Sequence, residues 1–309
     1  MLSRVADSIY WLSRYIERAE NVARSIDVNL QLQLDLPGEE RPWEPVVQAA
    51  GNAEEFFRAY SRISLENVLT FLTLDRSNPS SILSCIAAAR ENARCIREII
   101  SSELWMHINR FHLELSNPDI PARMLDNPHE FYTEVKEFSQ LAVGIMQGTM
   151  SHDIGWNFAR LGRLTERADQ TSRILDVKYF ILLPDPAMVG MVLDIVQWTA
   201  LLKSVSAFEM FRKRYSGATP RNVSEFLLLD RDFPRSLRYC VSEMEAGLKE
   251  IAGADSPCVT SLRKVGRLKA ELEFTTIEEI IAAGLHESIE SFQSRLADLT
   301  AAVRKDFLA

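Results

Sequence analysis

Two segments of the chain recur, and this repetition constrains the fold more than any other feature of the sequence. Residues 12–28 align with residues 161–177, and 8 of the 17 aligned positions are identical. Residues 67–85 align with residues 222–240, with 10 of 19 positions identical. Two separate blocks that recur in the same order indicate an internal repeat. We therefore interpret the chain as the product of a duplication.

The domain organisation follows from the repeat. No Gly-, Ser- or Pro-rich linker separates the halves, because the segment "MSHDIGWNF" leads directly into the second motif. Repeated helical units bury their apolar faces against each other. We therefore expect one domain over residues 1–309, in which repeat 1–150 and repeat 151–309 are related by a pseudo-twofold axis.

The apolar residues have a helical period. In the first segment they recur at spacings of three and four positions, as they do on one face of an α-helix. The sequence predicts an all-α protein of ten to eleven helices, with Asn78-Pro79 and Asn127-Pro128 as two helix starts. After a first helix that ends near Leu34, the expected helices are 43–60, 64–75, 79–115, 128–151, 153–183, 187–216, 220–230, 234–252, 257–273 and 275–306.

Composition and charge limit the class of protein. Hydrophobic residues make up 47% of the chain and charged residues 25%, which is typical of a globular protein with a sizeable core. The net charge of −8 argues against a nucleic-acid-binding protein, which would carry a basic patch. The first residues lack the apolar region of a secretory signal, no apolar run is long enough to span a membrane, and the four cysteines form no C-x-x-C motif. We therefore expect a cytoplasmic protein that does not enter the membrane.

No metal or cofactor site is predicted. None of the five histidines repeats between the halves, and none has the spacing of an HExxH zinc site. The sequence also lacks a Gly-rich phosphate loop and a G-x-S-x-G motif. We therefore expect neither a bound metal nor a cofactor.

The first repeated block carries an unusual charge pattern. Arg14, Glu17 and Arg18 are spaced i, i+3 and i+4 on the helix face opposite the apolar residues, so their side chains share one patch. Two arginines one turn apart repel each other, and a single glutamate cannot neutralise both. Arginine is suited to bidentate binding of carboxylate or phosphate. The pattern therefore calls for an outside partner, which is either a carboxylate from another helix or an anionic ligand. The candidate ligand-binding residues are Arg14, Arg18 and Asn21 in the first repeat and Arg163, Arg167 and Gln170, around Glu166, in the second.

A structural interpretation of the same residues stays open. Glu17 and Glu166 could hold arginines across the repeat interface in a lattice of ion pairs, because such networks resemble functional sites. The functional interpretation is that the two patches form or flank an anion site on the pseudo-axis, or that one of the glutamates is an acid or base.

The second repeated block places an aspartate where the helix dipole opposes it. Asp75 and Asp230 fall near the C-terminal end of an expected helix, where negative charge is unfavourable. The structural interpretation is that each aspartate accepts backbone N–H groups from the next helix or pairs with an arginine. The alternative is that Asp75 with Arg76, and Asp230 with Arg231, join the anion site.

Together these segments resemble a known family. "SIYWLSRYIERAENVAR", "WNFARLGRLTERADQTSRILDV" and the two "LDRxxPxS" blocks are similar to the alpha-E domain family, a bacterial all-helical group named for its Glu-Arg motif. The resemblance covers essentially the whole chain. Members of that family are typically encoded beside, and sometimes fused to, a circularly permuted ATP-grasp protein, often with a transglutaminase-like protein and a proteasome-like peptidase. The resemblance therefore implies a role in making or modifying a peptide or amide bond, with the ATP-grasp and transglutaminase-like proteins as partners.

Three functions stay open at this point. The first is a component of such a modification system that binds an anionic substrate or a partner enzyme through its Glu-Arg patches. The second is an enzyme in its own right, with Glu17 or Glu166 as acid or base and the arginines as an anion clamp. The third is a scaffold without a small-molecule site. A homo-oligomer is compatible with all three.

Overall fold

The computed structural model describes residues 1–35, 43–51, 53–181, 192–253 and 259–308. These residues form helices and turns, and no strand occurs among them, as the sequence predicts for an all-α protein. The chain divides into two compact units, Met1–Arg163 and Leu164–Ala309. The boundary lies inside helix α9 (Ile154–Ile181), so this helix contributes its first turns to unit 1 and the rest to unit 2.

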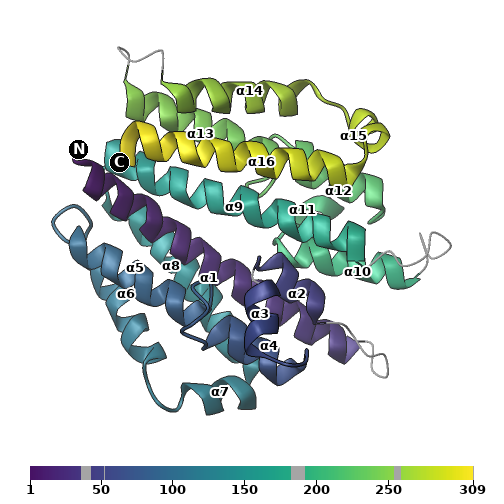
Figure 1. Ribbon diagram of the computed structural model, residues 1–309, viewed down its shortest axis with the longest axis horizontal. Coiled ribbons are helices and arrows are strands. Elements are labelled where there is room, and N and C mark those ends of the chain that lie inside the picture. Colours follow the sequence, from purple (N-terminus) through teal and green to yellow (C-terminus); the bar gives the residue numbers. More distant parts are fainter. Residues whose placement is uncertain (36–42, 52, 182–191, 254–258, 309) are drawn as a thin grey trace. The chain divides into compact units, whose positions relative to one another are not determined.

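Unit 1 is built around helix α1 (Ser3–Asp35), shown in purple in Figure 1. This helix packs against α5 (Ile82–Cys95) and α8 (Pro128–Thr149), and α6 (Ser102–Leu115) packs against both of those helices. The apolar residues of α1 that recur every three or four positions, such as Leu12, are buried in this core. The other helices of the unit are α2 (Glu44–Ala49), α3 (Ala53–Ala59), α4 (Leu65–Thr73) and α7 (Ile120–Asp126).

The most extensive helix packing of unit 2 is in the C-terminal part of the chain. Helix α14 (Thr260–Phe274) packs against α13 (Leu237–Ala252) and α16 (Leu285–Val303), and Figure 1 shows these three helices side by side. Helix α15 (Ile277–Ala283) contacts α16 and α12 (Pro220–Leu229). The remaining elements of the unit are α10 (Val192–Ser204), α11 (Phe208–Arg212) and the final π-helical turn η2 (Arg304–Leu308).

The expected number of ten to eleven helices is wrong, because the described residues form sixteen α-helices. Four expected helices are each divided in two, and α7 was not expected. Gly51, Ser206 and Gly284 adopt positive φ angles between the divided helices, and an α-helix cannot continue through that conformation. The fourth break follows Cys95, and the next helix starts after the capping residue Ser101. The divided segments are 43–60, 187–216, 275–306 and 79–115.

One of the two expected Asn-Pro helix starts is correct. The Asn127 side chain accepts a hydrogen bond from the Glu130 amide and caps α8. Asn78, by contrast, is buried in the turn before α5, where its side chain donates to the Phe71 carbonyl at 3.0 Å. Helix α5 is capped instead by Ser81, because its hydroxyl reaches an amide three residues further on.

An aromatic cluster has the same geometry in both units. The first two rings of the cluster stack at centroid distances of 5.2 Å in unit 1 and 4.9 Å in unit 2. The third ring meets the first edge-on at 5.2 Å and 5.7 Å, respectively. Each ring pair stabilises the fold by roughly 0.5–1.5 kcal/mol in addition to the contribution of its buried apolar area. The members, which lie 155 positions apart, are Phe56, Tyr60 and Phe71 in unit 1 and Phe211, Tyr215 and Phe226 in unit 2.

The caps of α4 and α12 also match. The hydroxyl of Ser64 accepts a hydrogen bond from the Asn67 amide at 3.2 Å, and that of Thr219 accepts one from the Asn222 amide at 3.2 Å. Each asparagine side chain then donates to a carbonyl oxygen five residues earlier, at 3.0 Å and 3.1 Å. The two helices therefore start through the same pair of side-chain contacts.

Candidate functional site

The first Glu-Arg motif lies in the middle of α1. Glu17 is only 1% exposed, Arg14 is also buried, and Arg18 is half-buried. The guanidinium carbon of Arg14 lies 4.8 Å from the centroid of the Trp11 ring, and that of Arg18 lies 6.0 Å from the Tyr15 ring. Aromatic faces attract guanidinium groups. Rings of the same helix therefore restrict the positions of both arginines.

The second Glu-Arg motif lies in α9. Glu166 is 0% exposed and Gln170 is buried, whereas Arg163 and Arg167 are half-buried. The Nη1 atom of Arg167 donates a hydrogen bond to the Pro234 carbonyl oxygen at 3.4 Å. Because this proline belongs to the second "LDRxxPxS" block, the two sequence motifs of unit 2 meet at this contact.

Both copies of the motif share one burial pattern. The glutamate is removed from solvent, and the arginine that follows it in the sequence keeps partial access. Adjacent residues of a helix are about 100° apart around its axis, so a buried side chain and an accessible one can follow each other. Asn21 of the same motif is buried as well. The polar face of α1 is therefore not exposed to solvent.

Two ion pairs support the motif helices one turn further along. In α1, Arg24 pairs with Glu20 at 2.5 Å, and in α9, Arg173 pairs with Asp169 at 2.9 Å. Pairs at this spacing stabilise a helix by about 0.3–0.5 kcal/mol when exposed. These four residues therefore help to form the helices that carry the motif.

Asp75 stabilises the turn between α4 and α5. Its Oδ1 atom accepts hydrogen bonds from the amide and hydroxyl of Ser77 at 2.8 and 2.7 Å, and its Oδ2 atom accepts one from the Tyr60 hydroxyl at 3.2 Å. Burial alone would raise the pKa of Asp75, but the hydrogen bonds from Ser77, Tyr60 and the Asn78 backbone lower it below its ordinary value. The neighbouring Arg76 is exposed.

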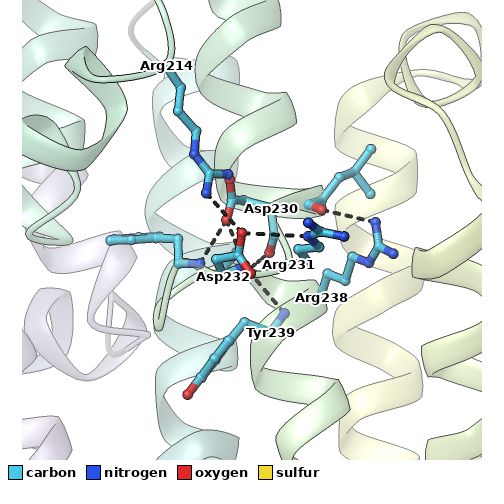
Figure 2. Close-up of polar contacts among 9 residues, drawn as sticks. Arg214, Asp230, Arg231, Asp232, Arg238 and Tyr239 are labelled. Atoms are coloured by element: carbon cyan, nitrogen blue, oxygen red, sulfur yellow. Dashed lines mark hydrogen bonds and ion pairs between the residues drawn. The ribbon is translucent and has the colours of Figure 1, made fainter.

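Asp230 stabilises the corresponding turn between α12 and α13, as Figure 2 shows. Its Oδ1 atom accepts hydrogen bonds from the amides of Asp232 and Phe233 at 2.9 and 2.7 Å. Its Oδ2 atom forms an ion pair with Arg214, whose second terminal nitrogen lies 3.0 Å from Asp232. Arg231 is exposed and lies 3.6 Å from Asp232. These contacts match the structural interpretation, in which each aspartate accepts backbone N–H groups or pairs with an arginine.

The helices that follow the two turns start alike. Ser81 and Ser236 cap α5 and α13, and each accepts a hydrogen bond from the amide three residues further on, at 3.1 Å in both cases. Four residues after each cap, the buried thiols of Cys85 and Cys240 donate to the carbonyl oxygen of the motif proline, at 3.8 and 3.6 Å. The "LDRxxPxS" blocks are therefore helix–turn–helix junctions.

A known family covers almost the whole chain. The model of the Alpha-E family, described as a predicted alpha-helical domain with a conserved ER motif, matches residues 1–308. The chain belongs to the Alpha-E family. The Glu-Arg pairs of this Alpha-E chain are Glu17-Arg18 and Glu166-Arg167.

Similar Alpha-E sequences occur in mycobacteria. The chain is 23% identical over 320 residues to the uncharacterized protein Rv2567 of Mycobacterium tuberculosis, and equally to the uncharacterized protein Mb2597 of Mycobacterium bovis. The match covers 97% of this chain but 35% of each relative, so the chain spans about a third of the length of the curated relatives it matches. No solved structure matches the chain.

A buried carboxylate of the Alpha-E chain contacts a histidine and a lysine of another helix, and sequence reasoning missed this cluster. Asp27 is only 2% exposed. Its Oδ1 atom lies 2.6 Å from Nδ1 of His129, and its Oδ2 atom lies 2.6 Å from Nζ of Lys136. Both partners come from α8, so this cluster joins the end of α1 to that helix.

Unit 2 contains a related pair. Nδ1 of His286 lies 2.6 Å from Oδ1 of Asp176, and this hydrogen bond raises the pKa of His286 above its ordinary value. His129 and His286 are each the second residue of their helix, and their aspartates are identical positions of the repeated block. The two histidines therefore make matching contacts, although they lie 157 positions apart, whereas the two sequence blocks have offsets of 149 and 155.

In the parts of the chain that the structure describes, no three His, Cys, Asp or Glu side chains are grouped so that they could hold a metal ion. None of the described helices is long and apolar enough to cross a membrane.

Proposed function

We propose that the chain is the helical component of an ATP-grasp-linked system that modifies a peptide or amide bond. In this proposal the arginines of the two Glu-Arg motifs bind an anionic group of the substrate, or of the ATP-grasp or transglutaminase-like partner, in the cytoplasm. The observation that carries the proposal is the burial pattern of the motif, in which a buried glutamate precedes a half-buried arginine in both copies.

The chemistry of arginine supports an anion as the bound group. Its guanidinium is planar, permanently charged and able to bind a carboxylate or phosphate through two parallel hydrogen bonds. The Trp11 and Tyr15 rings lie close to Arg14 and Arg18, and this restricts the arginine side chains before any anion arrives. A side chain that is already ordered loses less conformational entropy on binding.

Burial of the glutamates weighs against the alternative of an enzyme with a glutamate acid or base. Such a group must come within hydrogen-bond reach of the substrate proton, directly or through one water. Glu17 and Glu166 are 1% and 0% exposed. We therefore propose that the glutamates fix the motif within the fold and that the arginines make the external contact.

The scaffold alternative describes the "LDRxxPxS" blocks better than an anion site does. Asp75 and Asp230 direct their carboxylate oxygens to backbone amides and side chains of their own turns. Arg76 and Arg231 are exposed on the turns. We therefore leave these four residues out of the proposed anion contact.

We also infer that residues 1–150 and residues 151–309 are repeats of one ancestral unit. The matched aromatic clusters, the matched caps of α4 and α12, and the two Asp-His pairs support this inference. Two unrelated helical units are not expected to share three different kinds of contact in the same order along the chain.

The proposed anion contact can be tested with a charge-removing double variant. Arg18→Gln with Arg167→Gln keeps helix propensity and much of the side-chain length. We expect a melting temperature within a few degrees of the parent, and at least about a tenfold weaker binding of the circularly permuted ATP-grasp protein, as two lost charged contacts predict. Isothermal titration calorimetry with the purified proteins measures the affinity.

A matched double variant controls for general loss of positive charge. Arg76→Gln with Arg231→Gln likewise removes one arginine from each unit, in this case an exposed arginine of the turn. We expect this control to bind the partner as the parent does. The proposal fails if the Arg18/Arg167 variant unfolds, or if it stays folded and binds the partner unchanged.

A further inference from the structure

A pocket of about 560 Å³ lies within unit 2, among helices α12 to α16. Its wall is apolar and includes Leu268 and Leu272 of α14, Ile280 of α15, and Ile289 and Phe292 of α16. This volume is within the range of sites that bind small organic molecules. The region is visible in Figure 1 as the green and yellow helices labelled α12 to α16.

The charged residues that line the pocket all have the same sign. They are Glu271, Glu279 and Glu287, and the described residues that line the pocket include no lysine, arginine or histidine. Arg295 forms an ion pair with Glu271 and neutralises one of the three charges. Glu279 accepts hydrogen bonds from the amide and hydroxyl of Thr276 at 2.8 and 3.1 Å, but these donors are neutral and leave its charge in place.

Glu287 lines the pocket, and its side chain lies over a glycine. A Cβ atom on Gly284 would overlap the carboxylate of Glu287, so the side chain folds back onto the backbone at the start of α16. Among the residues that the structure describes, Glu287 forms no salt bridge, and its charge is one of the causes that raise the pKa of the preceding His286. The pocket therefore combines an apolar wall with a surplus of two negative charges.

Phe274 adds an exposed aromatic ring to this lining. It is the last residue of α14 and is 81% exposed, although it lines a pocket whose other aromatic residue, Phe292, is buried. An aromatic ring beside carboxylates attracts an organic cation, since the face of the ring carries a negative electrostatic potential. A ligand in the pocket would also cover apolar surface that is otherwise in water.

We propose that this pocket is a binding site for a small organic cation, namely an amine attached to an aromatic or branched aliphatic body. The apolar body occupies the space between α14, α15 and α16, and the ammonium group lies at the edge beside Glu287 and Glu279. This site takes a ligand of the opposite charge to the anion proposed for the Glu-Arg motifs and uses none of their residues. The two proposals therefore succeed or fail separately.

The test compares three probes of similar shape on the full chain. 1-Naphthylmethylammonium is the cation, 1-naphthylmethanol is the neutral analogue, and 1-naphthoate is the anion. Methyl resonances of Leu268, Ile280 and Ile289 report the location of binding by NMR, and the titration gives Kd. We expect shifts at these methyls, with the cation bound about fivefold tighter than the neutral probe, as an exposed charge contact predicts, and with the anion bound weakest.

Two variants and one matched control complete the experiment. Glu287→Gln should reduce the affinity for the cation toward that for the neutral probe, with Glu279 still present. Ala283→Phe, at a position that lines the pocket, should remove binding of both. Ala282→Phe, its exposed neighbour in α15 that does not line the pocket, should bind as the parent does.

Several results would overturn the assignment. They are equal affinity for the three probes, shifts confined to methyls outside the pocket, and an Ala283→Phe variant that is folded by circular dichroism and still binds. If a basic peptide shifts these methyl resonances and the small cation does not, the pocket binds a peptide and the proposal of a small ligand is wrong. The Arg18/Arg167 double variant should bind the cation unchanged, and Glu287→Gln should bind the ATP-grasp partner unchanged.

Discussion

The Oδ1 atom of Asp27 lies 2.6 Å from Nδ1 of His129, although 102 positions separate the two residues in the sequence. The second oxygen of the same carboxylate lies 2.6 Å from Nζ of Lys136. A buried carboxylate is costly unless it is paired. Asp27 thus makes the packing of α1 on α8 specific, because a shift of either helix would leave its charge without partners.

Asp27→Asn should destabilise the protein by about 2–3 kcal/mol, because it leaves Lys136 without its carboxylate partner in a mostly buried place. Urea unfolding followed by circular dichroism measures the change. Asp176→Asn is the matched variant and should cost less, about 1 kcal/mol, since Asp176 is more exposed. Equal costs at the two sites would contradict this account of burial.

His286 should make stability depend on pH. Its hydrogen bond to Asp176 raises its folded-state pKa above the ordinary value of 6.5, so its protonated form stabilises the fold. The stabilisation is fully present below about pH 6.5 and is lost as pH rises through the higher folded-state pKa. The difference in unfolding free energy between the parent and His286→Gln should therefore shrink as pH rises above 6.5.

Tyr132→Phe should destabilise unit 1 by about 1–2 kcal/mol, because it leaves a buried hydroxyl without its partner. The hydroxyls of Tyr132 and Thr73 lie 2.9 Å apart and both residues are buried. Burial also raises the pKa of Tyr132, so the phenol stays protonated at neutral pH. A double-mutant cycle with Thr73→Val tests the contact, and strictly additive costs would show that the two hydroxyls do not interact.

Gly162→Ala should destabilise the protein by about 2 kcal/mol or more, because overpacking forces the backbone to move. A Cβ atom at this position would overlap the carbonyl oxygen of Tyr10 in α1. Gly144→Ala in α8 is the control, since no atom lies near its added methyl group and alanine favours a helix. The control should gain about 0.5–1 kcal/mol in thermal or urea unfolding. A stabilised Gly162→Ala protein would show that the close approach is absent.

The helical class and the core of α1 could be predicted because they follow from local periodicity. Leu12, Ile16 and Ala19 are buried as their spacing requires. The break at Ser206 could not be predicted, because no proline or glycine marks it and a positive φ at serine depends on the surrounding packing.

The candidate site was predicted only in part, for a related reason. The sequence identifies the Glu-Arg motif, but it does not show that Glu17 is buried, because burial of a polar face depends on which helices cover it. The Asp27–His129 pair depends on how two distant helices pack, and no short-range pattern contains that information.

The two buried cysteines make it possible to time the opening of each unit separately. Cys85 in unit 1 and Cys240 in unit 2 are both 0% exposed and occupy the same place after a helix cap. A thiol reagent can modify them only when their surroundings open, so its rate reports the local opening free energy. Cys95 is exposed and would react without any opening of the fold, so its labelling rate is the reference for an unprotected thiol. In single-cysteine variants, labelling followed by mass spectrometry would then reveal which unit opens first, a kinetic difference that a single melting curve averages away.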